Sequence, residues 1–202
     1  IVDEGAITHD GRLELDAAAT ADLPVTLRAL LGSRIDALAP GTRTVLRVGS
    51  VIGMTFREST VGDVLGETVD PALYERLAEA AMIVPSDASG GWRFCHALIH
   101  DAAYRSLLAT DRAILHTRVA DRLEASRPDG PVAPIARHRA AAGDAIRAVP
   151  LLLRAADQAA TLAAPTEAAS YLETAAGLEP DPERAAELRQ RAAEARGSAL
   201  LN

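Results

Sequence analysis

Apolar residues recur every three or four positions over most of the chain, which is the spacing of one face of an α-helix. In the first part of the chain this period predicts helices over about 24–38, 40–52, 57–65, 71–81, 96–109 and 110–123. Pro24, Pro40 and Pro71 mark three of the starts, because proline is favoured at the first helical position. Asp70 adds a side chain that can cap the fourth helix. This part of the chain is therefore expected to be mostly helical.

The period changes in two places, where short apolar runs flank turn residues. Met82–Pro85 and Trp92–Cys95 bracket a loop over 86–91, which predicts a two-stranded ribbon. Helices followed by such a ribbon are in the order expected of a winged helix. Near the start, Ala6–Thr8 and Leu13–Leu15 flank an Asp-Gly pair, which is a hairpin signal.

A turn at Arg127–Pro131 is the predicted boundary between two parts of the chain. Beyond it, helices are predicted over about 135–142, 144–161, 166–178 and 181–200. The small-residue pattern of Glu167–Ala175, closed by Pro180, resembles a tetratricopeptide unit. Because a repeat cannot bury its open face alone, further copies are expected beyond Asn202.

Composition supports a mainly α fold. Hydrophobic residues make up 49% of the 202 residues but aromatic residues only 3%, so alanine and leucine supply most of the apolar surface. The predicted architecture is a winged-helix-like helical domain with a small two-stranded ribbon, followed by an α–α helical repeat segment.

The residue content limits the kinds of catalysis that the chain can perform. All 21 basic residues are arginine, so this chain has no lysine for a P-loop or for Schiff-base formation. A Gly-x-Ser-x-Gly nucleophile elbow is also missing. The chain is therefore expected to be non-catalytic. The chain has a single cysteine, Cys95, and neither a signal peptide nor a long apolar run. These features are expected of a cytoplasmic protein.

Several ordered motifs carry a resemblance to a known family. They are Leu23–Leu31, Ser33–Leu38, Val51–Phe56, Phe94–Tyr104 and Arg112–His116. In this order they resemble the segment that follows the ATPase core of STAND/AAA-type regulators. Bacterial adenylate-cyclase-like proteins and LuxR-type transcriptional regulators, especially in actinobacteria, carry such segments.

The resemblance implies a division into three parts. Residues 1–22 would hold the end of the ATPase lid helix plus the hairpin, residues 23–127 the winged-helix-like domain, and residues 128–202 the tetratricopeptide-like segment. The chain would couple the nucleotide state of an upstream ATPase domain of the same chain to a helical-repeat sensor. It would bind no cofactor itself, since ATP or ADP belongs to that ATPase, and the repeats would bind an unidentified protein or small-molecule effector.

The resemblance also points to His96. In related immune receptors a histidine near the end of the winged helix touches the phosphates of the bound nucleotide, and His96 is the matching residue, although Ala97 stands where those receptors usually have aspartate. The alternative role is a helix cap that locks the ribbon to the next helix. His100, four positions on, shares a helix face with His96, as zinc ligands do in metalloproteases, but Ala97 replaces their glutamate general base.

Two further alternatives concern surfaces. A winged helix that binds DNA is the rival function, yet residues 57–93 carry seven acidic side chains against three arginines, which would repel phosphate. After the ribbon, five arginines form either a solvated face with i,i+4 pairs or a docking surface for an acidic domain: Arg105, Arg112, Arg118, Arg122 and Arg127. We favour the solvated face and expect no binding of nucleic acid or membranes.

Overall fold

The computed structural model describes residues 25–86, 90–126 and 130–199, which form ten helices and three short strands. The first part holds α1 (Val25–Asp36), α2 (Pro40–Ile52), β1 (Thr55–Phe56), α3 (Glu58–Leu65), α4 (Ala72–Glu79), β2 (Ile83–Ser86), β3 (Gly91–Phe94), α5 (Ala97–Arg105) and α6 (Ala109–Ser126). The second holds α7 (Val132–Ala141), α8 (Ala145–Thr161), α9 (Pro165–Leu178) and α10 (Pro182–Ala199). The mainly helical prediction is confirmed. The hairpin and lid-helix end predicted within residues 1–22 lie outside the described residues.

The sheet has three strands, so the prediction of a two-stranded ribbon was wrong in strand number. All pairings are antiparallel in the order β1-β3-β2, with Thr55 opposite Arg93 and Ile83 opposite Phe94. Strand β1 has two residues, too few for a period of two to be visible in the sequence. Strand β1 can pair closely with β3 because Gly91 has no side chain. A Cβ at Gly91 would collide with the carbonyl oxygen of Phe56.

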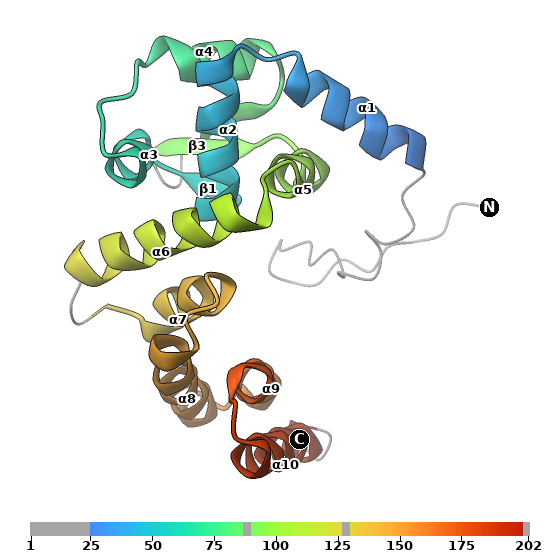
Figure 1. The fold of residues 1–202 in the computed structure, drawn as a ribbon, viewed down its shortest axis with the longest axis vertical. Coiled ribbons are helices and arrows are strands. Elements are labelled where there is room, and N and C mark those ends of the chain that lie inside the picture. The colour runs from blue at the N-terminus through green and yellow to red at the C-terminus, as the bar shows by residue number, and fades with distance from the viewer. Residues whose placement is uncertain (1–24, 87–89, 127–129, 200–202) are drawn as a thin grey trace.

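Helix α2 supplies the centre of the first core. Its residues Val45, Leu46 and Val48 are buried, and the sheet contributes Phe94 to the same cluster. Figure 1 shows α2 crossing the sheet, with α3, α4 and α5 arranged around it. Beside this core, the indole ring of Trp92 stacks on the phenol ring of Tyr74. The cluster also includes Val119 of α6, so α6 belongs to this core.

The corner between α5 and α6 differs from the prediction. Helix α5 ends at Arg105, not at Ala109, and α6 begins before Thr110, which was predicted to cap it. The Arg112 N–H donates to the carbonyl of Leu108, so Leu108 is the first carbonyl of the new helix. At this corner Leu107 packs on the core, while Leu108 is 70% exposed.

Helices α7 to α10 each pack on the next and share a second core. Its buried residues are mainly alanines, with Leu152, Tyr171, Leu172 and Leu188 among the larger side chains. Asp144 caps α8, since its carboxylate accepts from the Arg147 N–H. Figure 1 shows α6 lying between the sheet and this stack of helices. No helix in the described ranges is both long and apolar enough to span a bilayer.

Candidate functional site

His96 lies where β3 ends and α5 begins. Its backbone is extended, and its Nδ1 accepts a hydrogen bond from the Leu98 N–H at 3.2 Å, so it caps α5. Because Nδ1 is the acceptor, the proton of the neutral ring is on Nε2. The side chain is exposed. His96 is therefore a structural cap that also presents one N–H donor to solvent.

The other candidate metal ligands are not gathered around His96. His100 turns toward the core, where Nδ1 lies 3.1 Å from Asp101 Oδ1 and the ring meets Phe94 edge-on. His116 is bound elsewhere, to Tyr104. Among the residues that the structure describes, no group of three or more histidine, cysteine or acidic side chains could hold a metal ion.

A partly buried hydrogen-bonded chain, which we call the histidine chain, joins three helices. It consists of Tyr104 on α5, His116 on α6 and His138 on α7. The Tyr104 hydroxyl lies 2.8 Å from His116 Nε2, and His116 Nδ1 lies 2.8 Å from His138 Nδ1. The hydrophobic pattern does not predict this chain, although His116 lies on the buried face of α6 with Val119. The partner of His116 is 22 residues away, and periodicity carries no information on that pairing.

Both histidines of the chain are held neutral. Burial, followed by repulsion from Arg112, lowers the pKa of His116 from 6.5 to about 4. Burial, then repulsion from His116 and Arg137, lowers the pKa of His138 from 6.5 to about 4. Protonating both rings would put a hydrogen on each Nδ1 atom, and the bond between them would be lost. The histidine chain thus requires at least one neutral ring.

Arg139 makes a second link across the same helices. Its side chain is 0% exposed, and Nη2 donates to Asp121 at 2.6 Å and to Glu124 at 2.7 Å, both on α6. Nη1 lies 3.8 Å from Asp144, the cap of α8, and makes no hydrogen bond. The hydrogen bond to Glu124 raises the pKa of Arg139, while burial acts in the opposite direction. One buried guanidinium therefore connects α6, α7 and α8.

The arginines after the ribbon do not form the i,i+4 pairs that we expected. Arg118 donates to the Val64 carbonyl, and Arg122 donates to Asp63, so both tie α6 to α3. Arg112 stacks over the Tyr104 ring, 5.2 Å from its centre. Arg105 is exposed, and Arg127 lies outside the described residues. Arg118 and Arg122 are exposed, as a solvated face requires, but their partners lie on α3 and not one turn away on α6.

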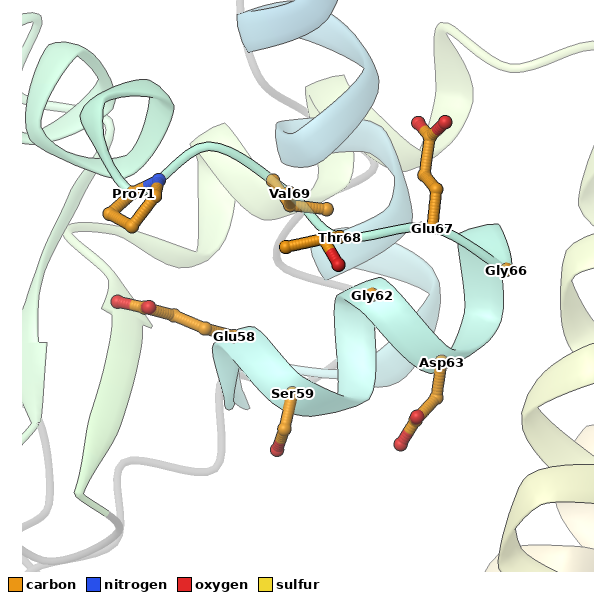
Figure 2. Close-up of a pocket in the computed structure, with 9 residues that line it drawn as sticks. All are labelled: Glu58, Ser59, Gly62, Asp63, Gly66, Glu67, Thr68, Val69 and Pro71. Atoms are coloured by element: carbon orange, nitrogen blue, oxygen red, sulfur yellow. The ribbon is translucent and has the colours of Figure 1, made fainter.

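The surface that a winged helix would turn toward DNA is acidic. Figure 2 shows a shallow hollow around α3 and the loop to α4, with the carboxylates of Glu58, Asp63 and Glu67 at its margins. Glu58 accepts from the Trp92 indole at 2.8 Å, and Asp63 pairs with Arg122. Carboxylates in these positions disfavour a phosphate backbone, in agreement with the charge count of residues 57–93.

Comparisons with known proteins add no relative. The chain matches no protein-family model, and neither a curated protein nor a solved structure is significantly similar to it. Arguments about function therefore rest on the residues and contacts described above.

We predict that acid weakens the fold through the histidine chain. In the unfolded state each histidine protonates near pH 6.5, and in the folded state only near pH 4. Between these values the unfolded chain binds more protons, so the free energy of unfolding falls as pH falls, by up to about 1.4 kcal/mol per pH unit for each proton. Urea unfolding of His138→Gln between pH 7 and 4 should show a shallower pH dependence than the wild type.

His96→Asn is the control, because it removes an exposed imidazole and keeps a helix cap. Equal slopes for His138→Gln and the wild type would show that the buried pair does not titrate in this window.

We further predict that Arg139→Met lowers the free energy of unfolding by about 2 kcal/mol, since it removes the charge-assisted hydrogen bonds from a buried guanidinium to Asp121 and Glu124 of α6. Arg147→Met is the matched control: Arg147 pairs with Asp144 and Asp121 too, but on the surface, and should cost less than about 1 kcal/mol. Urea denaturation measures both. Similar losses in the two variants would contradict a special role for the buried guanidinium.

Proposed function

We propose that this chain is a regulatory module of a STAND-type ATPase, which couples the nucleotide state of an ATPase domain to a helical-repeat sensor. The proposal begins from the resemblance of the Leu23–Leu38 and Phe94–Tyr104 motifs. In this interpretation residues 23–127 act as a winged-helix-like domain and residues 128–202 as tetratricopeptide-like repeats. The module itself performs no chemistry, and it works in the cytoplasm.

The order of elements supports the winged-helix interpretation. Helix α2, strand β1, helices α3 and α4, and strands β2 and β3 follow one another, with β3 in the middle of the sheet. A small sheet formed by one early strand and a later hairpin is the arrangement that a winged helix requires. The missed strand β1 therefore adds weight to the resemblance.

The observation that carries the proposal is the way α5 is held at its two ends. At its start, His96 presents an N–H donor to solvent. At its end, Tyr104 is hydrogen-bonded through His116 to His138 of α7. A ligand that moves the helical repeats thus acts on the helix that carries the proposed phosphate sensor. The coupling would be a shift in population between ADP-bound and ATP-bound arrangements.

The DNA-binding alternative leads to an opposite expectation. Helix α4, the recognition helix of that alternative, exposes Glu75, Arg76 and Glu79, and the adjacent α3 is acidic. We predict no saturable binding of a random-sequence duplex to the 202-residue chain in fluorescence anisotropy at low salt. Tight binding that weakens steeply with added salt would favour the DNA-binding alternative instead.

Two substitutions at His96 separate a phosphate sensor from a helix cap. Aspartate is a good cap but carries the charge that repels phosphate, whereas alanine removes both functions. In a protein where this chain follows its ATPase domain, we predict that His96→Asp and His96→Ala both speed ADP release, by about tenfold. In thermal unfolding of the chain alone, only His96→Ala should be destabilised, by about 1 kcal/mol.

Wild-type ADP release in both variants, with the loss of stability in His96→Ala, would show that His96 is only a cap. Ser170→Ala, on the exposed face of α9, is the control for the release measurement.

A further inference from the structure

A groove on the solvent side of the histidine chain holds arginines that lack carboxylate partners. We call it the arginine groove, and its walls include His100, Asp101, Tyr104 and Arg105 of α5, Arg112 of α6 and Ala141 of α7. It lies at the opposite end of α5 from His96, so it is separate from the proposed phosphate sensor.

The groove carries more positive than negative charge, although the chain as a whole has a net charge of −7. Arg105 and Arg112 have no ion pair among the described residues. The one carboxylate in the groove, Asp101, is hydrogen-bonded to His100. The groove therefore keeps an excess of positive charge in an acidic protein.

Arg112 is also held in place before any ligand arrives. Its guanidinium stacks over the Tyr104 ring at 5.2 Å, which orders the side chain and leaves the N–H groups at its edge as donors. A planar guanidinium fixed in this way suits two oxygens of a phosphate or carboxylate. The side chain loses less freedom on binding than a mobile surface arginine would.

His116 and His138 do not neutralise the positive charge of the groove, and nearby arginines contribute to their lowered pKa values. Repulsion by Arg112 contributes to the lowered pKa of His116, and repulsion by Arg137 to that of His138. Arg137 lies one helical turn before Ala141, on the same face of α7. The groove itself carries the guanidinium groups of Arg105 and Arg112, with Asp101 as the opposing charge.

We propose that the arginine groove binds a phosphate-type dianion, with its oxygens between the guanidinium groups of Arg105 and Arg112. The ligand is either a free small phosphate or a phosphoryl group carried on a polypeptide, since both present the same oxygens. Binding at this place adds negative charge beside the histidine chain. It thereby raises the affinity of His116 for a proton and changes the link between α5 and α7.

The test is a titration of the 202-residue chain with inorganic phosphate at pH 7.5 and constant ionic strength, followed by NMR of the arginine Nε–H groups and the His116 ring. The Arg105 and Arg112 signals should shift and saturate. The His116 ring signals should shift with the same midpoint, because the bound phosphate lies beside the histidine chain. A parallel titration uses a phosphoserine peptide, with its serine form for comparison.

Variants make the assignment specific. Arg105→Gln and Arg112→Gln should each weaken binding by about tenfold, as the loss of one charge-assisted hydrogen bond predicts. Arg112→Lys should weaken it too, because lysine keeps the charge but not the planar fork. Arg189→Gln, an exposed position on α10, should bind as the wild type. Because Arg105 is exposed, Arg105→Gln remains interpretable if an Arg112 variant unfolds.

Saturation with inorganic phosphate assigns the groove to a small ligand, and saturation with the phosphoserine peptide alone assigns it to a modified polypeptide. The proposal is overturned if neither probe saturates these signals, or if Arg105→Gln and Arg189→Gln bind equally well.

Discussion

The packing of α6 against α7 is the interaction on which the arrangement of the whole chain depends. Helix α6 packs on α2 and α3 with one side and on α7 with the other. Two polar links cross its second side, the His116–His138 hydrogen bond and the ion pairs of Arg139. Apolar packing alone is not directional, so these links fix the angle at which the helical stack leaves the sheet.

The two links respond differently to their surroundings. Arg139 keeps its charge at any ordinary pH, and its fully buried side chain is balanced by carboxylates that remain partly exposed. His116 is buried and His138 partly buried, both are neutral, and their bond depends on which ring nitrogens carry hydrogen. One link is therefore permanent, while the other can be changed by any charge that approaches it. Helix α5 adds to the second link through Tyr104.

Arginine has three uses in this lysine-free chain, and burial distinguishes them. Arg139 is an internal counter-ion, whereas Arg118 and Arg122 fasten α6 to α3 at the surface. Arg105 and Arg112 remain without carboxylates at the corner where α5 turns into α6. Because a guanidinium has five donors in a plane, the same side chain can hold a helix, stack on an aromatic ring or receive an oxyanion.

Much of the local structure was predictable. Helical period and the proline start signals placed most helices within a few residues of their ends, because these features act between neighbours in the chain. The candidate site was predictable only at His96, where a polar residue between a strand and a helix is a cap signal. The corner at Leu107 and Leu108 was not predictable, because it depends on which of the two leucine side chains packs into the core.

The sequence by itself determined the helical class, the acidic charge, the absence of lysine and the position of His96. Only the tertiary structure decided the third strand, the histidine chain and the partners of the arginines. The pairing of Thr55 with Arg93 and of His116 with His138 joins residues 38 and 22 positions apart. Such contacts depend on how elements pack in space, and the hydrophobic period of each element is the same whichever partner it meets.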